Sequence, residues 1–131
     1  MTLLQALIEY CKAHGQVADD GVDAFRDFLP DEPDNCIALF EYLGDLVSPF
    51  IECRHRSVQV VCRAPDADSA RDKAFSLQKI FEAETESLRI DFTDTLWGQV
   101  YIRQSPFKLD QDEQDRVLYG FNLGITTNIV E

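Results

Sequence analysis

Hydrophobic residues recur at helical spacing over residues 3–14, where one side of a helix would carry Leu3, Leu4, Leu7, Ile8 and Cys11. Such a stripe is typical of a helix that buries one face. Thr2 and Gln5 can form a capping box at its start, and Gly15 can adopt the left-handed conformation that ends a helix. The pattern therefore predicts an N-terminal helix.

A second helical pattern follows Pro65 and runs to about residue 83. Asp66 or Asp68 can cap its first turn by accepting a hydrogen bond from a free backbone N–H. Arg71, Lys73 and Lys79 lie outside the apolar stripe of this predicted helix. The stripe is expected to consist of Ala67, Ala70, Ala74, Leu77 and Phe81, supported by Phe75 and Ile80.

Other segments have the composition and alternation of β-strands. Residues 36–43 form a compact apolar run that suits a buried strand, and residues 88–92 and 97–104 are further strand patterns. Residues 50–64 are expected to form one strand, or two segments with a bend at Arg54–Arg56. Residues 116–130 alternate for a long stretch. Their predicted core face consists of Val117, Tyr119, Phe121, Leu123, Ile125, Thr127 and Ile129.

The remaining segments are expected to be connections. Residues 16–35 are acidic and broken by glycine and proline, although Phe25, Phe28 and Leu29 could form a short strand or an anchor on the core. A loop is expected at residues 44–49. Pro106 is expected to close the strand at 97–104, and residues 108–115 are expected to be a charged loop.

Local hairpins between these strands predict a largely antiparallel sheet. With the two helices, the order indicates an α+β fold, in which a mainly antiparallel sheet carries two helices packed on it. The length of 131 residues is that of one domain. Residues 1–131 are therefore expected to form a single domain.

The chain is strongly acidic, with 24 acidic and 12 basic side chains and a net charge of −12. Such a surface repels phosphate backbones, so sequence-specific binding to nucleic acid and binding to a membrane are not expected. No apolar run approaches the ~20 residues that span a bilayer, and the first residues lack the basic region of a secretory signal. A soluble protein made in a cytosol is expected.

The sequence contains no constellation that indicates catalysis. His14 is expected at a helix end and His55 in a loop, and neither has a nucleophile or carboxylate at a recognisable spacing. The acidic run at 110–115 lacks the glycine and the final glutamate of a calcium loop. Cysteines occur at Cys11, Cys36, Cys53 and Cys62. They lack Cys-x-x-Cys spacing and are expected to be reduced, core-filling thiols. The sequence therefore predicts no metal site, no cofactor and no enzymatic activity.

The last strand and one basic patch indicate where the chain could contact other proteins. The strand face opposite the predicted core offers little bulk to cover the backbone, so it could be exposed or could contact another subunit. The basic residues at 54–56 could contact an acidic region of an identical copy. The candidate interface residues are Arg54, His55, Arg56, Gly120, Asn122 and Gly124.

Four stretches carry a resemblance to a known family: Ser48–Ala64, the helix start at Asp66–Ser69, Trp97–Asp112 and Arg116–Val130. Together they resemble the tail terminator proteins, also called minor capsid proteins, of long-tailed bacteriophages and prophages. The resemblance covers most of the chain from Asn35 onward and includes no catalytic signature.

The resemblance implies a virion structural protein that assembles in the bacterial host cytoplasm as a hexameric ring. Such a ring caps the tail-tube protein, ends tail polymerisation and provides the surface for head joining. Its implied partners are further copies of itself, the tail-tube protein and a head-completion protein, with no cofactor. A second interpretation stays open: a small ferredoxin-like regulatory or ligand-binding domain, which would be a monomer or dimer with a defined apolar pocket.

Overall fold

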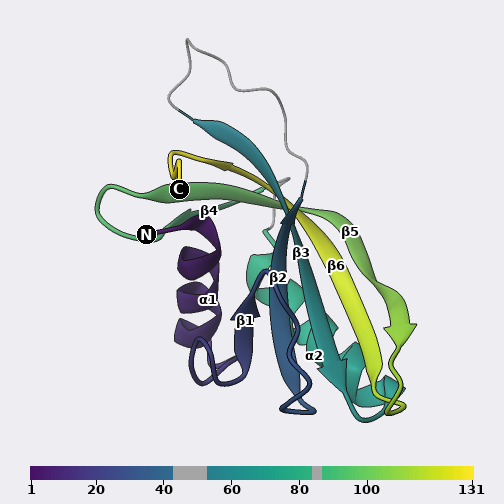
Figure 1. The fold of residues 1–131 in the computed structure, drawn as a ribbon. Helices are drawn as coiled ribbons and strands as arrows, with labels where there is room; N and C mark the ends of the chain where they lie inside the picture. Colours follow the sequence, from purple (N-terminus) through teal and green to yellow (C-terminus); the bar gives the residue numbers. More distant parts are fainter. Residues whose placement is uncertain (43–52, 84–86) are drawn as a thin grey trace.

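Figure 1 shows the computed structural model, which describes residues 1–42, 53–83 and 87–131. The fold is α+β, as the sequence predicts. The elements in chain order are α1 (Leu3–Ala13), β1 (Ala24–Arg26), β2 (Cys36–Tyr42), β3 (Arg54–Ala64), α2 (Ala67–Phe81), β4 (Leu88–Asp91), β5 (Trp97–Gln111) and β6 (Val117–Thr127).

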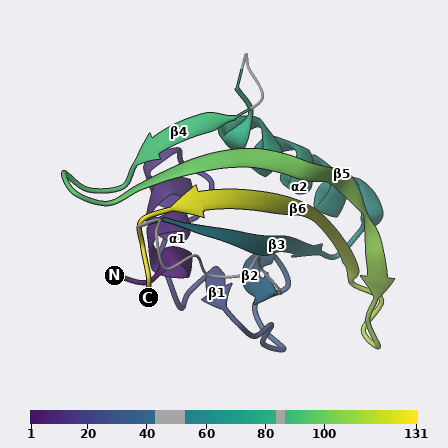
Figure 2. The ribbon, with the colours of Figure 1, turned by 90° about the horizontal axis from the view of Figure 1, so that it is seen from above.

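The described strands form one six-stranded sheet in the order β1-β2-β3-β6-β5-β4. Strand β1 pairs in parallel with β2, and every other neighbouring pair is antiparallel. The sheet curls, and β5 bends along its length (Figure 2). Both described helices contribute to the same apolar cluster on one face of the sheet, so neither of them covers the opposite, helix-free face.

The core lies between the two helices and the faces of the strands that the alternation predicts. Val58 and Val60 of β3 and Phe121 of β6 are fully buried there, and the Phe121 ring lies 6.4 Å from that of Phe81 on α2. The predicted burial of Leu77, Leu123 and Ile125 is also confirmed. Large side chains from both helices and the central strands thus share one hydrophobic core.

Local capping explains where the helices begin. The predicted capping box of α1 is present, because the Thr2 hydroxyl accepts from the Gln5 N–H and the Gln5 side chain accepts from the Thr2 N–H. Asp66, one of the two predicted caps of α2, accepts from the Ser69 N–H. Gly15 follows α1 with a φ of 71°, the left-handed conformation expected of it.

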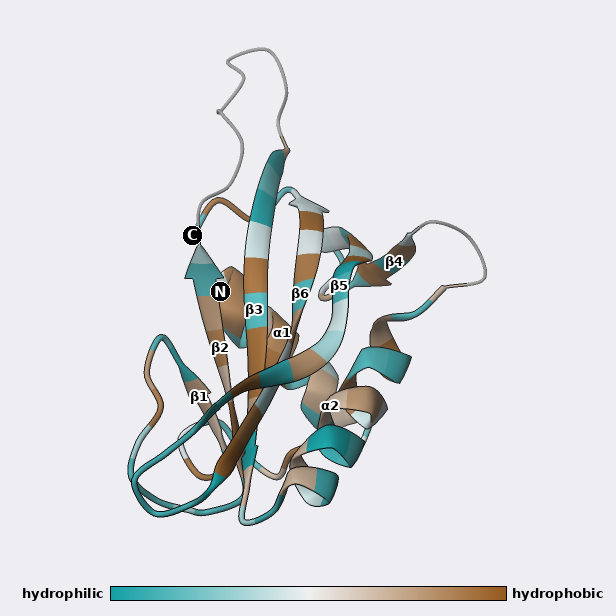
Figure 3. Ribbon diagram, turned by 90° about the vertical axis from the view of Figure 1, so that its right-hand side faces the viewer, coloured by the Kyte–Doolittle hydropathy of each residue, from teal (hydrophilic) through white to brown (hydrophobic). Residues whose placement is uncertain are grey.

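Strand β5 is longer than predicted, because Pro106 does not end it and residues 108–111 belong to it and not to a loop. The pairing of β5 with β6 shifts register at three places, one of them between Gln104 and Phe107. A bulge leaves residues outside the hydrogen-bonded ladder, so a proline without an N–H can be accommodated there. The β5 extension then bends across the helix-free face (Figure 3).

Several predicted details of the other elements differ in the structure. Phe75, assigned to the apolar stripe of α2, is 41% exposed, and Ala67 is exposed as well. Phe25 lies in the short strand β1 and is buried, whereas Phe28 is exposed. The predicted loop at 44–49 and the first residues of the predicted strand at 50–64 lie outside the described residues.

Candidate interaction surfaces

Arg56, predicted as a contact residue, is occupied by its own chain. Its Nε donates to Glu41 Oε1 at 2.6 Å and its Nη2 to Glu41 Oε2 at 2.7 Å. Its Nη1 donates to the carbonyls of Ile129 at 3.0 Å and Glu131 at 3.1 Å. The side chain is only 13% exposed. Arg56 therefore ties β2 and the C-terminal end of the chain to β3.

The other two residues of the predicted basic patch lie at the start of β3. His55 is in this strand, opposite Thr126 of β6, and not in a loop as predicted. Its Nδ1 lies 2.7 Å from the Thr126 hydroxyl, and the residue is exposed. Strand pairing through residues 54–56 therefore replaces the bend that was one of the two alternatives. Among the described residues of the patch, His55 is exposed and Arg54 is half-buried.

The glycine-containing face of β6 is covered, contrary to the expectation that it has little bulk over it. The Tyr101 ring occupies the space where a Cβ on Gly124 would lie, with its Cζ 2.1 Å from that position. At Gly120, the corresponding position is 2.6 Å from Leu109 Cδ1 and 2.8 Å from the Val60 carbonyl oxygen. Asn122 is half-buried and donates to Gln104 Oε1 at 2.9 Å. Side chains of β5 thus pack where the glycines leave room.

An acidic pole gathers at one end of the molecule around the buried Arg116. Its Nε donates to Asp112 at 2.7 Å, and its Nη1 lies 3.2 Å from Asp34 and also contacts the Asp31 carbonyl. Burial acts to raise the pKa of Asp112, but hydrogen bonds from the Arg116 and Gln114 N–H groups and the Arg116 side chain outweigh it, so the pKa is lowered. The predicted solvated acidic loop is thus organised by one arginine.

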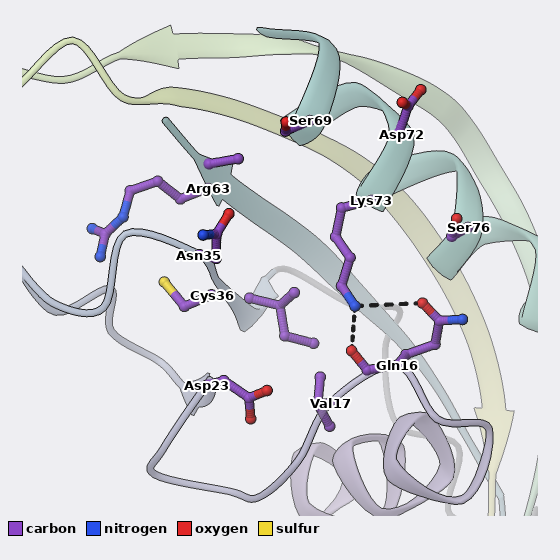
Figure 4. Close-up of a pocket in the computed structure, with 12 residues that line it drawn as sticks. Gln16, Val17, Asp23, Asn35, Cys36, Arg63, Ser69, Asp72, Lys73 and Ser76 are labelled. Atoms are coloured by element: carbon purple, nitrogen blue, oxygen red, sulfur yellow. Dashed lines mark hydrogen bonds between the residues drawn. The ribbon is translucent and has the colours of Figure 1, made fainter. Parts of the chain in front are cut away.

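A groove of about 430 Å³ lies between α2 and the β1–β2 region (Figure 4). Its two cationic side chains are held by backbone carbonyls. Lys73 donates to the Gln16 carbonyl, and Arg63 Nη2 donates to the Pro33 carbonyl at 2.7 Å. Figure 4 shows Arg63 extending away from Lys73. These side chains connect loops to the sheet and the helix, and do not converge on a common point.

The cysteines are placed as packing residues. Cys11, Cys36 and Cys62 are buried and Cys53 is half-buried, and all are free thiols. Burial raises the pKa of Cys11 to about 12 and also raises the pKa of Cys62. A thiol must ionise to act as a nucleophile, and burial disfavours the ionised form of these two core cysteines at neutral pH.

Two surfaces that the sequence did not single out stand apart from the rest. The first, the α2 ridge, consists of Arg71, Phe75 and Lys79, which follow one another at four-residue spacing on the solvent side of α2. The Arg71 guanidinium carbon lies 4.9 Å from the centre of the Phe75 ring. The ring lies about 100° around the helix from Ala74, and this offset was the signal in the sequence that Phe75 leaves the buried stripe.

The second surface, the β1 pocket, is a cavity of about 390 Å³ beside the first strand. The Phe28 ring contacts the Phe25 ring edge-on at 5.4 Å between centroids and is itself 55% exposed. Arg26 lies 3.1 Å from Asp20. The pocket is lined by Asp20, Gly21, Phe25, Arg26, Asp27 and Phe28.

Among residues 1–42, 53–83 and 87–131, no group of His, Cys, Asp and Glu is placed to hold a metal ion. No helix in the same ranges is long and apolar enough to cross a membrane. The sequence profile of a family described as bacteriophage tail terminator protein matches residues 14–129. No curated protein sequence matches the chain at a significant level.

Proposed function

The chain belongs to the bacteriophage tail terminator family, whose profile matches residues 14–129, and from this we propose that it caps the tail tube, ends tail polymerisation and provides the surface for head joining. Membership of this family gives it a structural role in the phage tail. The family match is the observation that carries the proposal.

The proposed assembly is a closed ring, with six subunits as the expected number. A head-to-tail contact between identical subunits either closes into a ring or continues as a filament. A protein that ends tail growth must form the closed ring, because a filament would continue to grow. The net charge of −12 suits a ring through which DNA passes, because acidic groups repel the DNA backbone and prevent adhesion.

The proposed partners are further copies of the chain, the tail-tube protein below the ring and a head-completion protein above it. Arg54 and His55 remain proposed contact residues, since they are the members of the basic patch that are not tied into the chain as Arg56 is. On the glycine-containing face, a neighbour would meet Tyr101 and Leu109, because these side chains cover Gly124 and Gly120. We propose no catalytic activity, because tail terminators form a structural family.

The ferredoxin-like alternative has less support. Its element order is β-α-β-β-α-β, whereas this chain has three strands after each helix among the described elements. A ligand-binding domain would need a groove with free polar groups. In the groove between α2 and the β1–β2 region, Lys73 and Arg63 already donate to backbone carbonyls.

Polymerisation of purified tail-tube protein tests the capping function. Adding this protein should shorten the tubes and place extra density at one end in electron micrographs. An unrelated protein of similar net charge is the control. An unchanged distribution of tube lengths with the protein in excess would contradict the proposal. Sedimentation of the protein alone and with tube rings tests the ring.

A further inference from the structure

The α2 ridge and the β1 pocket are complementary surfaces of one chain. We infer that the α2 ridge of one copy docks into the β1 pocket of the next copy, with the Phe75 ring entering beside Phe25 and Phe28. This inference rests on the proposed function, because it names the contact through which copies of a tail terminator meet.

The α2 ridge has the composition of a protein contact. Phe75 is 41% exposed although it is a large apolar side chain, and Arg71 covers part of its ring. Aromatic residues and arginine are the residue types enriched at the centres of protein interfaces. Among the described residues, neither Arg71 nor Lys79 forms an ion pair. Their charges are therefore available to a partner.

The β1 pocket offers the matching features. Its volume of about 390 Å³ can accept an aromatic ring against the exposed Phe28, which packs on the buried Phe25. Asp27 is exposed at its rim and forms no ion pair within the described ranges. A pocket with an exposed aromatic ring in its lining and an unpaired carboxylate at its rim fits an aromatic residue flanked by two cations.

Charges of both signs lie on each surface. The solvent side of α2 also carries Asp72, and the β1 pocket also contains Arg26, which lies 3.1 Å from Asp20. A cation of the ridge can therefore meet Asp27, a pocket carboxylate that forms no ion pair among the described residues.

The elements that carry the two surfaces lie on opposite sides of the molecule. Strand β1 is one edge of the sheet, and α2 lies over β3, β5 and β6 toward the other edge. Figures 2 and 3 both place β1 and α2 on opposite sides of the molecule. A ridge on one side and a pocket on the other make a head-to-tail contact that can repeat from copy to copy. A second copy of this chain is therefore the occupant.

Single substitutions test each side by sedimentation over a concentration series. Phe75→Ala and Phe28→Ala should each weaken self-association by about 30-fold, because truncating a buried aromatic at an interface has an effect of this size. Tyr42→Ala, which truncates an aromatic side chain with the same 41% exposure as Phe75, should leave association unchanged. Lys79→Glu should weaken association on the order of tenfold, whereas the matched change Lys108→Glu should not. Circular dichroism confirms that each variant is folded.

Mixing two variants gives the decisive result. Phe75→Ala keeps the pocket and loses the ridge, whereas Phe28→Ala keeps the ridge and loses the pocket. At a concentration where the wild type associates but a contact about 30-fold weaker does not, each variant alone should sediment as a monomer. The mixture should form a heterodimer and nothing larger, since one intact contact is left per pair. Oligomers in either single variant at this concentration, or a mixture that stays monomeric, overturn the inference.

The test of the ridge–pocket contact and the test of the capping function can give different results. A protein that shortens tail tubes but associates equally well with Phe75→Ala and Phe28→Ala is a terminator that uses other surfaces. A protein that stays monomeric both alone and with tube rings overturns this inference and the ring together, and the tube-length measurement then decides the capping function by itself.

Discussion

The guanidinium of Arg56 binds both carboxylate oxygens of Glu41, at 2.6 Å from Nε and 2.7 Å from Nη2. The same side chain also reaches the carbonyls of Ile129 and Glu131. A side chain with four internal hydrogen bonds is part of the fold, so a charge reversal at Arg56 disturbs the monomer before it disturbs any assembly.

Arg56→Ala should lower the free energy of unfolding by about 1.5–3 kcal/mol, because it removes charge-assisted hydrogen bonds from a mostly buried group. Urea titration followed by circular dichroism measures the change. Arg54→Glu serves as the control and should stay within about 0.5 kcal/mol of the wild type. Equal losses in the two variants would contradict the role assigned to Arg56.

Phe121→Ala should lower the free energy of unfolding by about 3–5 kcal/mol, because a large ring that is fully buried in the core would leave a cavity. Phe75→Ala is the matched control, since it truncates the same side chain on the surface. A loss below about 1 kcal/mol at Phe121 in denaturant unfolding would show that this face of β6 is not the core face.

Gly124→Ala should destabilise the fold by about 1–3 kcal/mol, because the new methyl group would overlap the Tyr101 ring. Tyr101→Ala in the same chain should remove most of this cost, which a double-mutant cycle measures. Gly120→Ala is the contrasting case: Leu109→Ala should not relieve it, because the Val60 carbonyl oxygen also lies 2.8 Å from the new Cβ. Rescue at both glycines, or at neither, would argue against this packing.

Because the pKa of Asp112 is lowered in the folded protein, part of the free energy of unfolding should vary with pH in the acidic range. The unfolded chain binds a proton at the ordinary aspartate pKa of ~3.9, whereas the folded chain resists protonation until lower pH. The stabilisation from the Asp112–Arg116 contact is therefore complete above ~3.9 and is lost as the pH falls through the lowered pKa. The stability gap between wild type and Asp112→Asn should be larger at neutral pH than at about pH 3. A gap that does not change with pH would contradict this assignment.

Duplex DNA should not bind the isolated protein at physiological salt, because its net charge is −12 and phosphate contacts require a basic surface. Fluorescence anisotropy with a labelled duplex measures this directly. Tight binding that weakens steeply with added salt would reveal a basic surface that the net charge conceals.

Local periodicity and capping in the sequence predict most of the elements and most of the core residues. The alternation of residues 116–130 identified the buried face of β6, and the Thr2–Gln5 capping box identified the start of α1. The sequence also contained the family resemblance that the profile match over residues 14–129 confirms. Each of these features is encoded within a short stretch of chain.

Long-range contacts, which no local pattern encodes, set which candidate contact residues are occupied by their own chain. Arg56 finds its partners 15 and 73–75 residues away in the chain, so no local pattern could show that it is occupied. The cover over Gly124 comes from Tyr101 on the neighbouring strand, and its position depends on how β5 pairs with β6. Pro106 stays within β5 because a register shift in this pairing places it outside the ladder. Whether a side chain is available to a partner is set by long-range packing, and this packing forms only when the sheet does.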